Sequence, residues 1–224
     1  MKHKAFTNII AHSCRVPGKT VVLFARNLKE AGLLTTGARG VNAPEMTVLD
    51  LTRMVIALCA TDRPSDAVEM SNRYRVARSN EAATITVGDR KIAIPAGEEL
   101  EDFLSAMLGL PHLVLTDLGL GLFIHWNRLS AEVWICEAKI TFKVELTKEE
   151  TENQRYGTFA GITTTRGLAS QELTEMAVPF YLEKEDGTTW EEMIASGTVS
   201  KVAARHIFRA IAQDTVEPVT GERS

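Results

Sequence analysis

Histidine and cysteine side chains are the residues of this chain that could ligate a transition metal or act as nucleophiles. The sequence contains the following: His3, His12, His112, His125, His206, Cys14, Cys59 and Cys136. No two histidines stand three or four residues apart, which is the spacing typical of zinc ligands. The cysteines are widely separated and odd in number, which favours neither a disulfide framework nor a cysteine zinc site. We therefore expect no metal and no cofactor.

A short basic motif, Gly18-Lys19-Thr20, has the ending of a nucleotide-binding loop, in which backbone amides surround the phosphates of a nucleotide. That loop also needs an upstream glycine, and position 13 carries Ser13 instead. No apolar segment typical of a buried strand precedes it. The dinucleotide-binding fingerprint is also missing, because Gly119 and Gly121 lack the third glycine. The sequence does not predict a nucleotide site.

One acid and base pattern suggests catalysis. Asp117 ends a predicted strand, and Glu137-Ala138-Lys139 lies on a later predicted strand about 20 residues on. This pattern resembles the core of PD-(D/E)xK nucleases. The resemblance implies that the carboxylates of Asp117 and Glu137 hold Mg²⁺ and that Lys139 supports the attacking water. Glu-x-Lys also arises on ordinary amphipathic strands, so a magnesium-dependent nuclease is an alternative, and a protein without catalytic activity is the favoured interpretation.

The first sixty residues have the pattern of a helix-turn-helix. Ala5 to Cys14 predicts a first helix, and Val16-Pro17-Gly18 ends it with a tight turn. Thr20 to Ala31 predicts an amphipathic second helix, which Gly32 ends as a C-terminal cap. A loop with Arg39 between Gly37 and Gly40 follows. A helix begins again at Thr47, with Asp50 in the position of a capping box, and runs to about Cys59.

This order of elements resembles the second half of a winged helix-turn-helix domain, most closely over Leu28 to Leu34, and it is similar to small regulators carried by phages and prophages. The resemblance implies that the second helix enters the major groove and that the loop, as the wing, reaches phosphates or the minor groove. The implied DNA-contacting residues are the following: Lys19, Thr20, Arg26, Asn27, Lys29 and Arg39. Such domains have a strand after the wing, whereas Met46 to Cys59 predicts a helix.

Charge is distributed unevenly along the chain. From Met1 to Pro44 there are seven basic residues against the single acidic Glu30, whereas the rest holds 18 basic and 28 acidic residues. A basic N-terminal part joined to an acidic remainder is expected when the N-terminal part binds phosphate and the remainder does not. Binding through several Lys and Arg side chains would release counterions and depend steeply on salt.

The periodicity changes after residue 78, so we expect a helical DNA-binding domain over 1–78 and an α+β domain over 79–224. A helix from Ser65 to Arg78 closes the first part. Further elements are predicted as a hairpin over 84–94, a helix over 98–108, strands over 113–117, 120–126, 132–146, 159–166 and 171–182, and helices over 190–195 and 199–213. The fold class is therefore α+β, with a mixed, mainly antiparallel sheet and flanking helices.

We interpret the chain as a regulator that binds double-stranded DNA, and the resemblance to phage and prophage regulators implies an origin in a phage or mobile element. The second part would form a homodimer or bind a ligand or protein partner. A further alternative is a phage-type protein that binds and inhibits a host protein. No apolar run approaches the roughly 18 residues of a membrane span, and no signal peptide is predicted. These features, with the cysteine pattern, predict a cytoplasmic protein.

Overall fold

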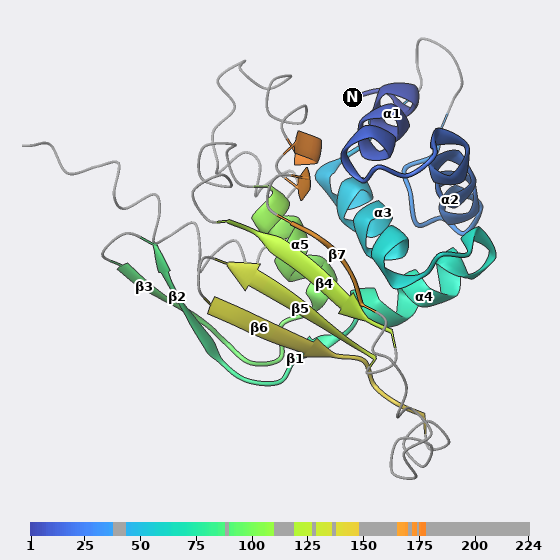
Figure 1. The fold of residues 1–224 in the computed structure, drawn as a ribbon. Coiled ribbons are helices and arrows are strands. Elements are labelled where there is room, and N and C mark those ends of the chain that lie inside the picture. Colours follow the sequence, from blue (N-terminus) through green and yellow to red (C-terminus); the bar gives the residue numbers. More distant parts are fainter. Residues whose placement is uncertain are drawn as a thin grey trace, which may run out of the picture.

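The computed structural model describes residues 1–37, 44–87, 90–109, 119–126, 129–135, 138–147, 165–169, 172–173 and 175–177. These residues form a mixed α+β structure, in which helices pack beside an antiparallel sheet (Figure 1). The predicted α+β class is confirmed at this level. Among the described residues, no helix is both long and apolar enough to cross a membrane.

Four α-helices form the N-terminal part: α1 (His3–Ser13), α2 (Gly18–Glu30), α3 (Val48–Ala60) and α4 (Ala67–Arg75), with a 3-10 turn η2 (Pro64–Asp66) before α4. The predicted bounds agree within three residues, because apolar periodicity and local end signals define these helices. Gly32 has φ +72° and follows α2 as expected, since glycine takes this conformation at little cost. Leu33 N–H donates to Leu28 O across this cap.

The turn between α1 and α2 is tight. Pro17 takes the N-cap position of α2, and Arg15 has φ 53°, in the left-handed region that few non-glycine residues adopt. The N–H of Val16 donates to Ala11 O, which closes the end of α1. The chain therefore reverses direction over only four residues, Cys14 to Pro17, and brings α2 against α1.

The main sheet has the strand order β1-β6-β5-β4-β7, with every neighbouring pair antiparallel. Its strands are β1 (Arg78–Ser79), β4 (Gly121–His125), β5 (Ser130–Ile135), β6 (Ala138–Lys143) and β7 (Thr165–Leu168). Strands β2 (Ala83–Val87) and β3 (Arg90–Ile94) pair separately as the predicted hairpin.

Two strand predictions were wrong. The segment predicted as one strand over 132–146 is two antiparallel strands, because Ile135 at the end of β5 pairs with Ala138 at the start of β6. The described residues of 171–182, namely 172–173 and 175–177, are helical rather than extended. The strand predicted over 113–117 and the helices predicted over 190–195 and 199–213 lie outside the described residues.

The hydrophobic core is shared by both sides of the predicted boundary at residue 78. Helix α3 is buried along most of its length and contacts α5 (Leu100–Leu108), which packs against the sheet. The rings of Phe103 on α5 and Phe142 on β6 lie 5.6 Å apart. The Trp126 Nε1–H donates to Cys59 O at 2.7 Å, and Tyr74 Oη donates to His125 O at 3.3 Å. These contacts join the helices to β4.

Candidate nucleic-acid interface

Helix α2 divides into a buried face and an exposed face. Val21, Phe24, Ala25 and Leu28 are buried in the core. On the opposite side Lys19 and Arg26 are exposed, and between them Val22 and Leu23 are 50% and 48% exposed. These four residues stand at positions i, i+3, i+4 and i+7 of the helix, so they form one continuous outward stripe. We call this stripe, Lys19, Val22, Leu23 and Arg26, the α2 outer face.

Cations lie on and beside the α2 outer face. Lys19 stands in the first turn of α2, where no side chain caps the helix, and Arg15 is exposed in the preceding turn. Arg26 Nε donates to Glu30 Oε1 at 2.7 Å, and this hydrogen bond raises the pKa of the guanidinium. Both side chains of this pair are mostly exposed, at 69% and 61%. An exposed pair of this kind is weak and screened by salt, so Arg26 can exchange Glu30 for another anion.

Asn27 and Lys29, two of the predicted contact residues, are less exposed than the α2 outer face. Asn27 Nδ2 donates to the carbonyl of Pro64 and so ties α2 to η2. Lys29 is half-buried, and burial lowers the pKa of its ammonium, although the Asp50 carboxylate acts in the opposite direction. The Asn27 amide is thus engaged within the fold, and DNA contacts by Asn27 and Lys29 stay predictions. Thr20 is half-buried, and Arg39 of the predicted wing lies outside the described residues.

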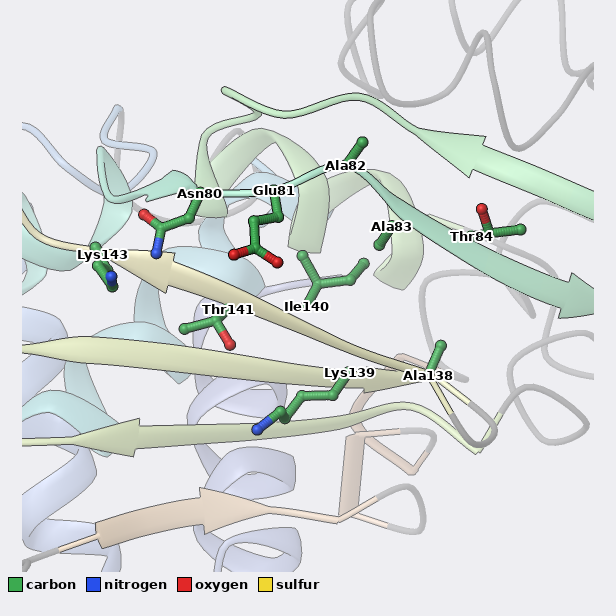
Figure 2. A pocket seen from close by; sticks show the side chains of 10 residues that line it. All are labelled: Asn80, Glu81, Ala82, Ala83, Thr84, Ala138, Lys139, Ile140, Thr141 and Lys143. Atoms are coloured by element: carbon green, nitrogen blue, oxygen red, sulfur yellow. The ribbon is translucent and has the colours of Figure 1, made fainter.

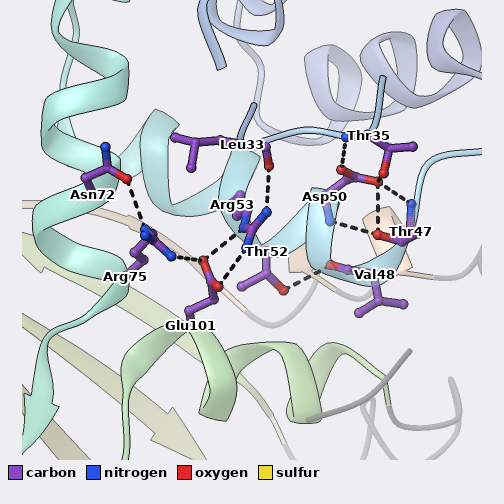
Figure 3. A network of polar contacts seen from close by, with 10 residues as sticks. All are labelled: Leu33, Thr35, Thr47, Val48, Asp50, Thr52, Arg53, Asn72, Arg75 and Glu101. Atoms are coloured by element: carbon purple, nitrogen blue, oxygen red, sulfur yellow. Dashed lines mark hydrogen bonds and ion pairs between the residues drawn. The ribbon is translucent and has the colours of Figure 1, made fainter. Parts of the chain in front are cut away.

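A polar network fixes the two ends of the segment that contains the predicted wing (Figure 3). The Asp50 carboxylate is buried and accepts hydrogen bonds from the N–H and hydroxyl of Thr35, and from the N–H and hydroxyl of Thr47. Thr35 precedes the predicted wing and Thr47 follows it. The reciprocal bond from Asp50 N–H to Thr47 Oγ1 completes the predicted capping box of α3. One carboxylate thus caps a helix and holds Thr35 next to Thr47.

An ion pair between Arg53 and Glu101 joins α3 to α5. Arg53 on α3 makes two hydrogen bonds to Glu101, each 3.0 Å long, and a third to Leu33 O. Arg75 on α4 approaches the same carboxylate at 3.6 Å. The hydrogen bond that Arg53 donates to Glu101 is the main cause that raises the pKa of Arg53, against the opposing effect of burial. Its bidentate geometry gives this pair a structural role in positioning α3.

The residues of the nuclease pattern are only partly described. Lys139 is exposed on β6, and its ammonium contacts Glu132 Oε1 at 3.3 Å. Asp117 and Glu137 lie outside the described residues, so the proximity of the three side chains stays a prediction. The described residues contain no group of three or more His, Cys, Asp or Glu side chains placed to hold a metal.

Sequence reasoning missed a polar pocket of about 540 Å³ beside the edge of the main sheet (Figure 2). It opens where the chain leaves β1 for β2, and Asn80 N–H still donates to Thr141 O there. Its polar lining side chains are Asn80, Glu81, Thr84, Lys139, Thr141 and Lys143. No local pattern in the sequence predicts such a pocket, because it depends on β2 leaving the sheet after two paired residues of β1.

Comparisons with known proteins identified no relative of this chain. No family model, curated protein or solved structure matches the chain. The function is therefore argued from the geometry, exposure and charge of the described residues.

Proposed function

We propose that the protein binds double-stranded DNA through α1 and α2, with the α2 outer face in the major groove. The observation that carries the proposal is this face itself: a helix that follows a tight turn directs Lys19 and Arg26 outward with two apolar side chains between them. Helix-turn-helix proteins present their second helix to base edges in this way. The basic charge of the first 44 residues supports the same interpretation.

Each part of the α2 outer face has a role in this proposal. Lys19, with Arg15 in the preceding turn, would contact backbone phosphates at the N-terminal end of α2, where free N–H groups also favour anions. Val22 and Leu23 are suited to the methyl groups of thymines, which are the apolar features of the major groove. Arg26 would leave Glu30 for a phosphate or a guanine edge.

The test is duplex binding by the double variant Lys19→Ala/Arg26→Ala, measured by fluorescence anisotropy at several salt concentrations. Removing these two cations should weaken binding about tenfold or more. It should reduce the slope of log K against log salt by about 0.9 when Lys19 alone contacts a phosphate and by about 1.8 when Arg26 also does. Glu30→Gln should strengthen binding, because it releases Arg26. Equal affinities and slopes for wild type and the double variant would contradict the proposal.

Two matched controls separate the α2 outer face from general charge effects. The double variant Lys139→Gln/Lys143→Gln removes the same amount of charge from the sheet and should leave duplex binding unchanged. Asn27→Ala should lower stability without changing the salt slope, since its side chain bonds to Pro64. The stoichiometry of the complex tests the expected homodimer, because a dimer would occupy two half-sites.

A further inference from the structure

The main sheet has a core face and an outer face. Leu122, Ile124, Val133, Ile140 and Phe142 point to the core, on the side of α5. Since side chains alternate along each strand, the residues between them point away from the core. These are Phe123, Glu132, Trp134, Lys139, Thr141 and Lys143, and we call them the sheet outer face.

The ring of Phe123 lies next to two glycines, which leave room for it. Phe123 sits in register with Gly167 of β7 and two residues from Gly121 of its own strand. A Cβ atom at Gly167 would come within 2.3 Å of Phe123 Cδ1, and one at Gly121 within 3.3 Å of Cε2. The ring therefore rests on backbone where other residues carry side chains. Phe123 is half-buried and belongs to the outer face, away from the core.

Trp134 provides a second aromatic surface beside Phe123. It pairs with Gly121 across β4 and β5 and is 39% exposed. The position that a Cβ of Gly121 would take lies 3.8 Å from Trp134 Cβ, so the two aromatic residues flank the same glycine. The indole N–H donates to Glu132 Oε2 at 3.3 Å, which fixes the orientation of the ring. Two aromatic side chains, Phe123 half-buried and Trp134 39% exposed, are thus held next to each other on the sheet outer face.

The charged side chains next to these rings and in the adjoining pocket are of both signs. Lys139 Nζ lies 5.8 Å from the centre of the Trp134 ring, and Lys143 is exposed farther along β6. Of the two carboxylates, Glu81 lines the pocket, and Glu132 contacts Lys139 at 3.3 Å and lies 3.6 Å from His125 Nε2. The charge of Glu132 is therefore compensated locally. The two lysines also line the 540 Å³ pocket, whose polar wall includes Asn80 and Thr141 (Figure 2).

We propose that the sheet outer face binds single-stranded nucleic acid. Bases stack on Phe123 and Trp134, while Lys139 and Lys143 contact the phosphates that follow. The pocket beside β6 receives the next base, for which Asn80 and Thr141 offer hydrogen-bonding groups. Exposed aromatic rings beside cations are the combination that single strands require, since every base has a stacking face and every linkage a charge. A duplex cannot use the rings, because its bases are already stacked.

The test uses the full chain and labelled oligo(dT) and oligo(rU) of about 12 nucleotides, within the usual site size of a sheet platform. Affinity is measured by fluorescence anisotropy at low salt. Trp134→Leu and Phe123→Leu keep apolar side chains, and each should weaken binding about 5- to 100-fold. Lys139→Gln/Lys143→Gln should weaken binding and flatten the salt dependence, by about 0.7 in slope for each lost contact. Comparison of the two oligomers distinguishes DNA from RNA as the strand.

Matched controls make this test independent of the proposed duplex binding. Lys19→Ala/Arg26→Ala and Val22→Ala/Leu23→Ala remove similar charge and apolar area from the α2 outer face, and both should bind single strands as wild type does. Circular dichroism and thermal unfolding check that the sheet variants fold. Wild-type affinity in all of the sheet variants, or no binding of either oligomer by the wild type, overturns the proposal and leaves the duplex proposal untouched.

Discussion

Asp50 and Thr35, 15 residues apart in the sequence, are joined by two hydrogen bonds: Thr35 N–H to Oδ1 at 2.7 Å and Thr35 Oγ1 to Oδ2 at 2.8 Å. The Thr47 N–H reaches the same Oδ2 at 2.6 Å. A single buried carboxylate therefore joins Thr35, which precedes the predicted wing, to Thr47, which follows it. Whatever the intervening loop contacts, its two ends are fixed relative to α3 and hence to α2.

Replacing Asp50 should cost more stability than an ordinary helix cap. Asp50→Ala should lower the free energy of unfolding by about 2–4 kcal/mol, because it leaves several donors at Thr35 and Thr47 without their acceptor. Asp50→Asn should have a smaller effect, since one side-chain oxygen remains. The measurement is urea denaturation followed by circular dichroism. Asp66→Asn is a suitable control at a half-exposed helix start, and its free energy of unfolding should fall by less than about 0.5 kcal/mol. An equal fall for Asp50→Ala and Asp66→Asn would contradict the stabilising role of the Asp50 contacts with Thr35 and Thr47.

The contact between Lys139 and Glu132 should be visible in the pH dependence of stability. Burial raises the pKa of Glu132, but the hydrogen bond and charge of Lys139, together with smaller effects of His125 and Trp134, lower the pKa overall. A lowered carboxyl pKa means that this stabilisation is present above the unfolded-state pKa and is lost as the pH falls through the folded-state value.

Lys139→Gln should therefore raise the pKa of Glu132, because burial remains while the compensating charge is gone. The difference in unfolding free energy between the variant and wild type should be largest near neutral pH and shrink as Glu132 becomes protonated. Urea denaturation at a series of pH values measures this difference, and NMR titration of the Glu132 carboxyl carbon measures the pKa directly. A difference that is constant from neutral to acid pH would show that the pair makes no such contribution.

The cysteines at the ends of α1 and α3 should be unreactive in the folded protein. Burial raises the pKa of both Cys14 and Cys59 to about 12, so that almost no thiolate is present near neutral pH. Cys14 also contacts the sulfur of Met176, with the two sulfur atoms 3.7 Å apart.

We expect iodoacetamide at pH 7.5 to modify these two thiols far more slowly in the native chain than in urea. Mass spectrometry of the digested protein assigns the labelled positions, and labelling in urea provides the reference rate. Rapid native labelling of Cys59, which is 1% exposed, would contradict the packing of α3 described above.

Local sequence patterns were sufficient for the N-terminal helices and for the β2–β3 hairpin. The helices have apolar periodicity and recognisable ends, such as Pro17, Gly32 and the capping box of Thr47 and Asp50, and these signals act over a few residues. The prediction of one strand over 132–146 was wrong because the alternation changes phase there: the buried apolar positions are odd-numbered up to Ile135 and even-numbered from Ile140, on either side of the chain reversal between β5 and β6. Val133, Ile135, Ile140 and Phe142 all point to the core, although they belong to two strands that run in opposite directions.

By itself, the sequence determined that α2 is amphipathic and that its surroundings are basic, because both follow from residue types along one helix. Only the tertiary structure decided which polar residues of α2 remain available. Lys19 and Arg26 stay exposed, whereas Asn27 bonds to Pro64 and Lys29 is half-buried near Asp50. The sheet outer face likewise depends on Gly121 and Gly167 meeting around Phe123. Helical period predicts a direction for each side chain, but neighbouring elements distant in sequence decide how much of each face they cover.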